Sequence, residues 1–190
     1  INNSLMQRNS AKQGGGLYIQ GTRAAISNTS IVGNSATSGP GINEYPNAGV
    51  GTLDLTNVTL SGHMPGPALD IADAITGMLT NCTIAGNATG IANGAGLGLA
   101  NIIVAGNSTA ACTKSHSSSG GNIQFPQGTA CSAGITIADP LLSPLQDNGG
   151  SLHAPTMLPA TGSPALKIGT ACPATDQRGQ TRPSGGCTAG

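Results

Sequence analysis

Asn81-Cys82-Thr83-Ile84-Ala85-Gly86-Asn87 is the stretch that decides the fold, because the same motif recurs along the chain. The motif begins with an asparagine in all five copies, namely at Asn3, Asn28, Asn57, Asn81 and Asn101. Successive copies are 25, 29, 24 and 20 residues apart. Repeats of this length are typical of solenoid proteins, in which each repeat forms one coil that stacks on its neighbours.

Large apolar residues alternate with smaller or polar ones on both sides of the leading asparagine, which predicts strands with one buried face. The alternation predicts one stacked column before the asparagine and one after it, formed by Ile26, Leu55, Leu79 and Leu99 and by Ile31, Leu60, Ile84 and Val104. A second, glycine-led strand lies between the motifs, with apolar residues at positions 17, 42, 69 and 91. Gly121-Asn122-Ile123-Gln124 is interpreted as a looser sixth copy of that strand.

These short strands without intervening amphipathic helices predict an all-β fold, a right-handed parallel β-helix of about five to six coils. A leucine-rich repeat is excluded, because the spacing L-x-x-L-x-L-x-x-N does not fit. Residues 1–142 are predicted to form the coils, with a disulfide-bearing insertion at 108–134. The Pro/Gly-rich residues 143–190 are predicted to be a loop-rich cap, because the last coil of a solenoid needs to be covered.

Composition excludes several classes of function. The chain has 30 glycines, 7% charged residues and a formal net charge of zero, and no basic patch of the kind that binds nucleic acid. No apolar run reaches the ~18 to 20 residues of a membrane span. The chain lacks an initiator methionine and begins inside a repeat, so we expect a mature or trimmed piece of a larger precursor.

Five cysteines are present, and none of them forms a C-x-x-C pair. Cys112 with Cys131 and Cys172 with Cys187 would each close a short loop, so we predict these two disulfides and an oxidising, extracytoplasmic location. Cys82 takes the place of Thr29, Val58 and Ile102 in the other copies and is predicted to be a buried, unreactive thiol.

The leading asparagines have a predicted structural role. Asparagine tolerates the left-handed backbone conformation of a tight corner better than any residue except glycine. Stacked in register, Asn3, Asn28, Asn57, Asn81 and Asn101 are predicted to form an asparagine ladder. The alternative is glycosylation, because N-x-S/T sequons occur at Asn2, Asn28, Asn57, Asn81, Asn87 and Asn107. Since the repeat itself dictates these residues, we interpret the sequons as incidental.

Candidate catalytic residues are sparse. Many β-helices are polysaccharide lyases or hydrolases, which need clustered carboxylates. Glu44, Asp70 and Asp73 are the one candidate cluster, and a solvated sheet edge explains them equally well. The three histidines, at 63, 116 and 153, lack metal-ligand spacing and are predicted to make turn or cap hydrogen bonds. Asp176 and Arg178 are expected to pair within the cap, and we predict no metal site and no cofactor.

The C-terminal region carries a specific resemblance. The run Asp139-Pro140-Leu141-Leu142-Ser143-Pro144-Leu145-Gln146-Asp147-Asn148-Gly149-Gly150 precedes His153, Gly162-Ser163-Pro164 and Thr175-Asp176-Gln177-Arg178-Gly179. This series resembles the C-terminal module of bacterial secreted β-helix proteins known as choice-of-anchor Q domain proteins. The preceding repeats resemble those of polymorphic outer-membrane proteins. The resemblance implies a β-helical, secreted or surface-exposed protein of a family mostly without assigned activity.

Two functional hypotheses follow. The first is a non-catalytic, structural or adhesive protein of the extracellular space or bacterial cell surface, which associates with further copies or other surface proteins. Ile1 aligns with Ile26 inside a coil. If Ile1 is the mature terminus, the first coil is uncapped and head-to-tail stacking would give a filament. The alternative is that the chain is cut from a longer solenoid. The second is a pectate-lyase-like enzyme or glycan-binding module. The near-absence of aromatic residues, 2% of the chain, disfavours the second.

Overall fold

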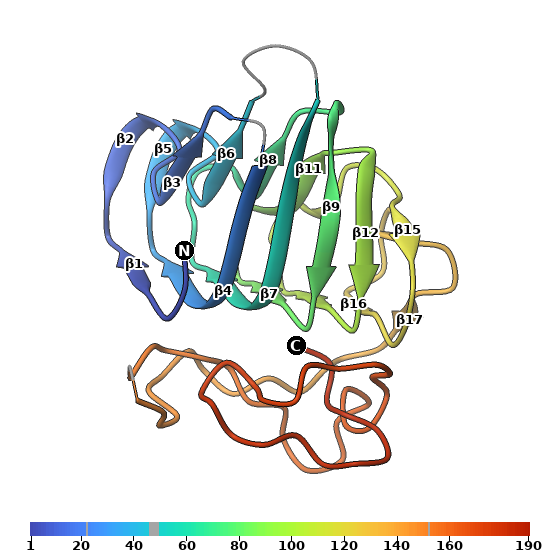
Figure 1. Ribbon diagram of the computed structural model, residues 1–190. Coiled ribbons are helices and arrows are strands. Elements are labelled where there is room, and N and C mark those ends of the chain that lie inside the picture. The colour runs from blue at the N-terminus through green and yellow to red at the C-terminus, as the bar shows by residue number, and fades with distance from the viewer. Residues whose placement is uncertain (22, 46–49, 152) are drawn as a thin grey trace.

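The computed structural model describes residues 1–190 except 22, 46–49 and 152. The fold is all-β and consists of a parallel β-solenoid of about five turns, as predicted (Figure 1). Every pair of neighbouring strands in the ladders is parallel, and the described residues contain no helix. Successive turns of the chain stack strand against strand, so residues about one repeat apart lie side by side.

The largest sheet contains the repeat motif. Its ten strands are β1 (Leu5–Gln7), β4 (Arg23–Val32), β7 (Gly51–Ser61), β9 (Ile75–Thr80), β10 (Thr83–Ala85), β12 (Gly96–Ala100), β13 (Ile103–Ala105), β15 (Ser117–Ser118), β16 (Ile123–Phe125) and β17 (Thr136–Ile137). In β4 and β7 the strand continues through the leading asparagine. In the later turns the same path is divided into two strands, one on either side of it.

Two smaller sheets complete each turn. The glycine-led strands form a five-stranded sheet of β3 (Leu17–Ile19), β6 (Ile42–Glu44), β8 (Pro67–Ile71), β11 (Thr89–Asn93) and β14 (Ala110–Cys112). A two-stranded sheet joins β2 (Ser10–Gln13) to β5 (Ser35–Ser38) in the first two turns.

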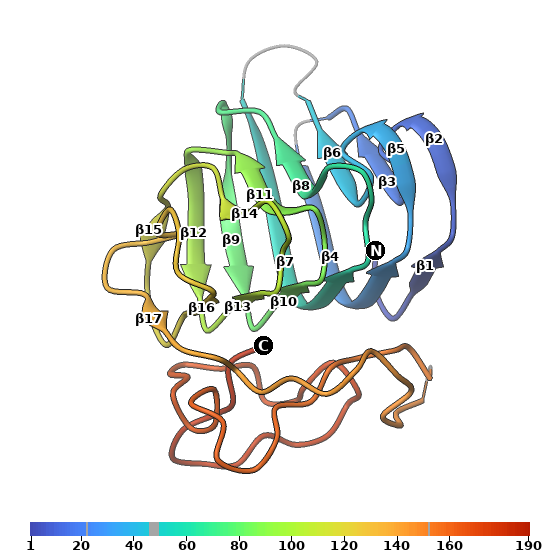
Figure 2. The same ribbon diagram turned by 180° about the vertical axis from the view of Figure 1, so that it is seen from behind.

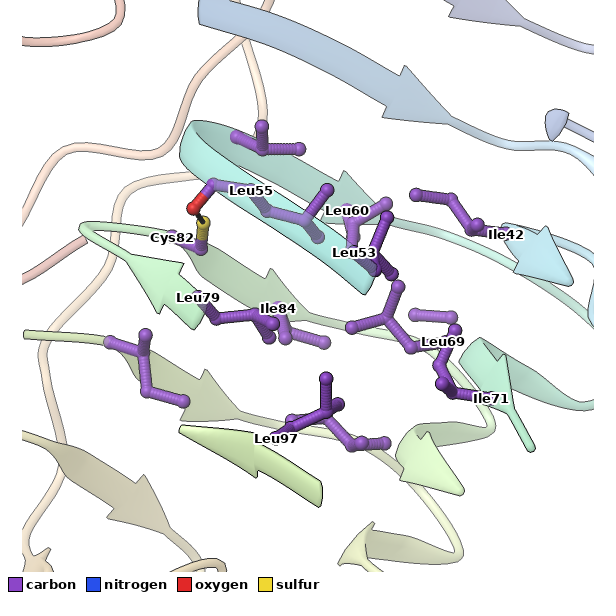
Figure 3. Packing of buried hydrophobic residues seen from close by; sticks show 14 of the residues in the cluster. Ile42, Leu53, Leu55, Leu60, Leu69, Ile71, Leu79, Cys82, Ile84 and Leu97 are labelled. Carbon is purple, nitrogen blue, oxygen red and sulfur yellow. Dashed lines mark hydrogen bonds between the residues drawn. The ribbon is translucent and has the colours of Figure 1, made fainter. Parts of the chain in front are cut away.

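The pairing register confirms the predicted columns. Ile26, Leu55, Leu79 and Leu99 are successive partners, as are Ile31, Leu60, Ile84 and Val104 and the apolar residues at 17, 42, 69 and 91. All three columns point into one continuous core of aliphatic side chains (Figure 3). The thiol of Cys82 lies in this core, as predicted, against the backbone carbonyl of Leu55.

The sixth copy of the glycine-led strand is placed differently from the prediction. Ile123 pairs with Ile103 of the repeat motif, so residues 121–124 belong to the large sheet. The last member of the glycine-led sheet is β14, where Cys112 pairs with Ile91. The region expected as an insertion at 108–134 therefore contains strands β14, β15 and β16. The sequence did not predict these strands, because the apolar alternation is weak in this Ser/Thr-rich region.

The C-terminal end of the solenoid is closed by the chain that follows β16. Cys131 and Ser132 are fully buried, and Cys131 is joined to Cys112 by one of the two predicted disulfides. Gln124 holds this segment in place, because its Oε1 accepts from the N–H of Cys131 at 2.9 Å and its Nε2 donates to the carbonyl of Thr129. Ile135 then packs against the core.

Residues 143–190, called the C-terminal strap below, lie along the side of the solenoid (Figures 1 and 2). A small apolar cluster joins the two parts, with Ile103 and Ile123 from the solenoid against Ala165, Ile168 and Ala189 of the strap. The second predicted disulfide, Cys172–Cys187, closes a loop of the strap. The strap therefore covers the outer face of β7, β10, β13 and β16, in addition to the closure of the end by residues 126–135.

A core substitution tests the stacked columns. Leu60 is fully buried in the column between Ile31 and Ile84. We expect Leu60→Ala to lower the free energy of unfolding by about 2 to 5 kcal/mol, because it leaves a cavity that the neighbouring coils cannot fill. Met78→Ala, at an exposed position of β9, is the control and should change stability by roughly 0.5 kcal/mol or less. Urea unfolding followed by circular dichroism measures both, and equal losses would contradict the assigned register.

Candidate functional site

The leading asparagines form the first corner of every coil. All five adopt the left-handed conformation, with φ between 48° and 56°, at Asn3, Asn28, Asn57, Asn81 and Asn101. This conformation turns the chain between the two halves of the motif without a loop. The corner amides consequently face outwards in one row along the solenoid.

Side-chain hydrogen bonds connect part of this row. Asn57 Nδ2 donates to Asn28 Oδ1 at 3.0 Å, and Asn101 Nδ2 donates to Asn81 Oδ1 at 3.3 Å. In the first coil, Asn28 Nδ2 donates to Oδ1 of Asn2, and not to the predicted Asn3. The row is therefore a ladder in two sections.

The strap occupies the break between the two sections. Asn57 Oδ1 accepts from Arg182 Nη2 at 3.0 Å, and Asn57 Nδ2 also donates to the carbonyl of Thr175. Asn81 Nδ2 donates to the carbonyl of Thr188 at 3.1 Å. Both amides thus bond the strap, and the row of leading asparagines forms the surface on which the strap binds.

Further polar contacts attach the strap to other coils. Gln177 bridges two of them, because its Nε2 donates to Ser30 Oγ at 2.6 Å and its Oε1 accepts from Thr59 Oγ1 at 2.7 Å. Thr170 forms a reciprocal pair with Asn101, whose Nδ2 donates to its carbonyl at 2.7 Å and whose Oδ1 accepts its N–H at 3.0 Å. The strap therefore makes separate contacts with four successive coils.

The charges of the strap are satisfied locally. Arg178 pairs with Asp176 at 2.6 Å, as expected. The Arg182 guanidinium donates to carbonyl oxygens of the strap and to Asn57, and burial lowers its pKa. Both arginines line a cavity of about 300 Å³ whose floor is formed by Thr59 and Thr83. The guanidinium donors already bond protein oxygens.

The last residue of the repeat motif forms a second corner, buried in every copy except the first, which the sequence reasoning did not identify as a ladder. Its members are Asn9, Asn34, His63, Asn87 and Asn107. The backbone N–H of each residue donates to the side chain of the next, at 2.8, 3.2, 3.0 and 3.0 Å. The recurring Gly-Asn at the end of the motif could have indicated this ladder, but His63 replaces the asparagine in one copy.

His63 takes the place of an asparagine in this second corner. Its Nδ1 lies 3.2 Å from the N–H of Asn34, so Nδ1 is the acceptor and the Nε2–H donates to the carbonyl of Ile31 at 2.9 Å. Burial lowers the pKa of His63, which keeps the ring neutral as this arrangement requires. His116 is also buried, with its Nδ1 beside the carbonyl of Gly94, whereas His153 is exposed and pairs with Asp147.

The three candidate acidic residues do not converge on one surface. Asp70 lies on the outer face of β8, where Ser38 and Asn93 donate to its carboxylate. Asp73 forms an exposed ion pair with Lys114 at 2.6 Å. Glu44 points the other way, into the core, because it alternates with Asn43 along β6 and pairs in register with buried Ile71. These three carboxylates therefore do not form the cluster that the sequence suggested.

Glu44 is fully buried, and neither carboxylate oxygen has a hydrogen-bond partner among the described residues. Burial raises its pKa to about 7, because the charged form is poorly solvated there. Its neighbours in register are the apolar Ile19 and Ile71. Glu44 is therefore a local destabilising element at neutral pH.

The sequons differ in accessibility. The amides of Asn57, Asn81, Asn87 and Asn107 are buried and hydrogen bonded, so the folded chain cannot present them to a glycosyltransferase. Asn2 is exposed. The repeat thus accounts for four of these sequons through packing.

The N-terminal end of the solenoid differs from the closed C-terminal end. Met6, Leu17 and Ile19 continue the core columns but are only half-buried, whereas their partners Ile31 and Ile42 are fully buried. In the described residues, β1, β2 and β3 are each paired on one side only, as are β14, β15 and β17 at the other end. This end, called the N-terminal face below, exposes apolar side chains together with unpaired strand edges.

No family model, curated protein or solved structure matches this chain. In the part of the chain that the structure describes, no helix is long and apolar enough to cross a membrane. The same residues contain no group of three or more His, Cys, Asp or Glu side chains arranged to hold a metal ion.

Glu44 should make stability depend on pH. Its folded-state pKa of about 7 lies above the ordinary value of 4.5, so the folded chain binds more protons between these values and stability falls as pH rises through them. We expect Glu44→Gln to match the wild type near pH 4.5 and to exceed it by up to about 3 kcal/mol near pH 8. Urea unfolding across this range measures the difference, and a difference independent of pH would rule out the buried carboxyl as its source.

His63 should have the opposite effect. Its pKa is lowered on folding, so its contribution to stability is present above the ordinary value of 6.5 and declines as pH falls below that value. We expect His63→Asn, which restores the repeat residue, to fold and to gain stability relative to the wild type as pH falls from 7 towards 5. Urea unfolding at each pH measures the gain, and a difference between the two proteins that does not change with pH would rule out His63 as its source.

Proposed function

We propose that the chain is a non-catalytic structural module of an extracellular or bacterial cell-surface protein. The observation that carries this proposal is the strap, which contacts one coil after another through Gln177, Arg182, Thr188 and Thr170. A covering that joins successive coils resists their separation, which suits a spacer or adhesive stalk. The resemblance of residues 139–183 to a choice-of-anchor Q module supports the same class of protein.

Association with other polypeptides is part of this proposal, and the N-terminal face is its expected surface. The exposed apolar side chains and unpaired strand edges there favour addition of further β-structure. Further copies of the chain and other surface proteins are the partners that this proposal includes.

The mechanical role of the strap is tested by Gln177→Ala. This change removes the bonds to Ser30 and Thr59, so we expect the strap to loosen and the free energy of unfolding to fall by about 1 to 3 kcal/mol. Gln180→Ala is the matched control, because the Gln180 side chain has no hydrogen bond among the described residues. Hydrogen exchange at β7 and β10 should quicken in the first variant only, and unchanged exchange there would count against the proposal.

The enzymatic alternative is tested directly. We expect the protein to be found at the surface or in the medium of the cells that make it, and to leave a panel of pectins, alginates and other acidic glycans uncleaved. Depolymerisation of any of these that is lost in Asp70→Asn and retained in Asp54→Asn would replace the structural proposal with a lyase or hydrolase.

A further inference from the structure

The two disulfides lie in different surroundings. Cys112 and Cys131 are 1% and 0% exposed, and both belong to the aliphatic core of the solenoid. The other disulfide lies in the strap, where Cys187 is 4% exposed but Cys172 is only half-buried. A thiolate can attack a disulfide in the folded chain only where it can reach a sulfur, so a core disulfide reacts after the fold has opened. Accessibility therefore favours reaction at Cys172.

A cavity of about 450 Å³ lies against the strap disulfide. Cys172 and Cys187 both line it, together with the cationic side chains of Lys167 and Arg182. The described residues that line this cavity include no carboxylate. Positive charge beside a sulfur attracts an incoming thiolate and stabilises the thiolate that leaves. The cavity therefore provides a route of attack with favourable electrostatics.

Two of the leading asparagines contact the sulfur atoms of this disulfide. Asn101 Nδ2 donates to Cys172 Sγ at 3.3 Å, and Asn81 Nδ2 donates to Cys187 Sγ at 3.9 Å. A charged thiolate accepts a stronger hydrogen bond than a neutral disulfide sulfur does. These amides therefore stabilise the reduced cysteines more than the disulfide, which favours its reduction.

The fifth cysteine does not supply the attacking thiolate. Cys82 follows Asn81 in the sequence, but its side chain is fully buried in the core of the solenoid. Burial raises the pKa of the Cys82 thiol to about 12, so it stays protonated at neutral pH. Because the thiolate is the nucleophile in this exchange, the reaction needs a thiol from outside the chain.

We propose that Cys172–Cys187 is a site of thiol–disulfide exchange with low-molecular-weight thiols. A thiolate attacks Cys172 Sγ and forms a mixed disulfide, while the bond to Cys187 breaks and its electron pair stays on Cys187 Sγ as a thiolate. A second thiolate attacks the external sulfur of the mixed disulfide and releases Cys172 as a thiolate. One disulfide of the strap is thus reduced to two thiolates, and two external thiolates are oxidised to one external disulfide.

Reduction acts on the attachment of the strap. The disulfide closes the loop of residues 172–187, which carries the strap contacts of Gln177 and Arg182 with the solenoid. Without it, two backbone bonds between Gly169 and Cys187 remain to hold the two ends of the loop together. The opened loop gains conformational freedom, so its contacts with the coils weaken. This inference goes beyond the proposed function, because it makes the attachment of the strap depend on the redox conditions.

Reduction of the folded full-length chain by glutathione tests the proposal. Samples are acidified at intervals, alkylated with iodoacetamide and mapped by mass spectrometry. We expect a glutathione adduct on Cys172 with alkylated Cys187, formed at least about tenfold faster than either cysteine of Cys112–Cys131 is modified. Equal rates for the two disulfides, a first adduct on Cys187, or no reaction of the strap disulfide in the folded chain would overturn the proposal.

A charge variant tests the route of attack. Lys167 has a φ of 62°, and asparagine tolerates this conformation, so Lys167→Asn removes the charge and keeps the backbone. We expect this variant to react with glutathione about threefold more slowly, because the attacking thiolate loses one attractive charge. Lys12→Asn, at an exposed position of β2, is the matched control and should react at the wild-type rate. A rate that is unchanged in Lys167→Asn, or equally slowed in both variants, would overturn the assignment of this cavity.

Hydrogen exchange tests the effect on the strap. The N–H of Thr170 donates to Asn101 Oδ1, and the N–H of Cys187 donates to the carbonyl of Gly169. After reduction and alkylation of the strap disulfide, we expect both amides to exchange at least about tenfold faster. The N–H of Thr113, which donates to Ile91 beside the core disulfide, is the internal control and should be unchanged. Unaltered exchange at Thr170 and Cys187 would overturn the link between this disulfide and the attachment of the strap.

Discussion

The left-handed corner is the constraint on which the remaining structure depends. In each copy of the motif, an asparagine with positive φ and a second residue with positive φ bracket a four-residue segment, as at Asn81 (49°) and Gly86 (68°). The second residue is a glycine in four copies and Arg8 in the first. These two corners give every coil the same shape, so that strands about one repeat apart meet in register. A shift of one residue would turn the whole column of Ile31, Leu60 and Ile84 out of the core.

Corner amides replace the features that usually stabilise a domain of this size. The core has no tryptophan, and the chain has few charges. Asparagine side chains instead occupy backbone donors and acceptors at the turns, one coil after another, and Asn87 alone bonds the next coil twice and the carbonyl of Leu60 once. Buried polar groups of this kind specify position, because any misplacement leaves them unpaired. The ladders thus help to fix the register that the apolar columns favour.

The sequence allowed prediction of the periodic parts of this structure and few of the others. The core columns and the burial of Cys82 followed from the regular spacing of the repeats, and both disulfides followed from the short loops that they close. The second ladder escaped notice because His63 differs chemically from asparagine while offering the same acceptor. The orientation of Glu44 was missed because its neighbour Asn43 is also polar, so composition gave no indication of which side chain points inwards. The path of the strap was unpredictable, since it contacts the corners largely through backbone carbonyls, such as those of Thr170 and Thr188, that leave no trace in the sequence.

The strap also restricts the number of coils in the solenoid. Between Thr59 and Asn101, the strap bonds three successive coils through Gln177, Thr188 and Thr170. An extra coil inserted in this interval would displace every later contact by about 4.8 Å, the spacing of neighbouring strands. Duplication or loss of a repeat beneath the strap would therefore break contacts with the strap. A repeat added or lost at the N-terminal face would not. Relatives of this fold that vary in length should accordingly vary at that end, with the strapped coils constant in number.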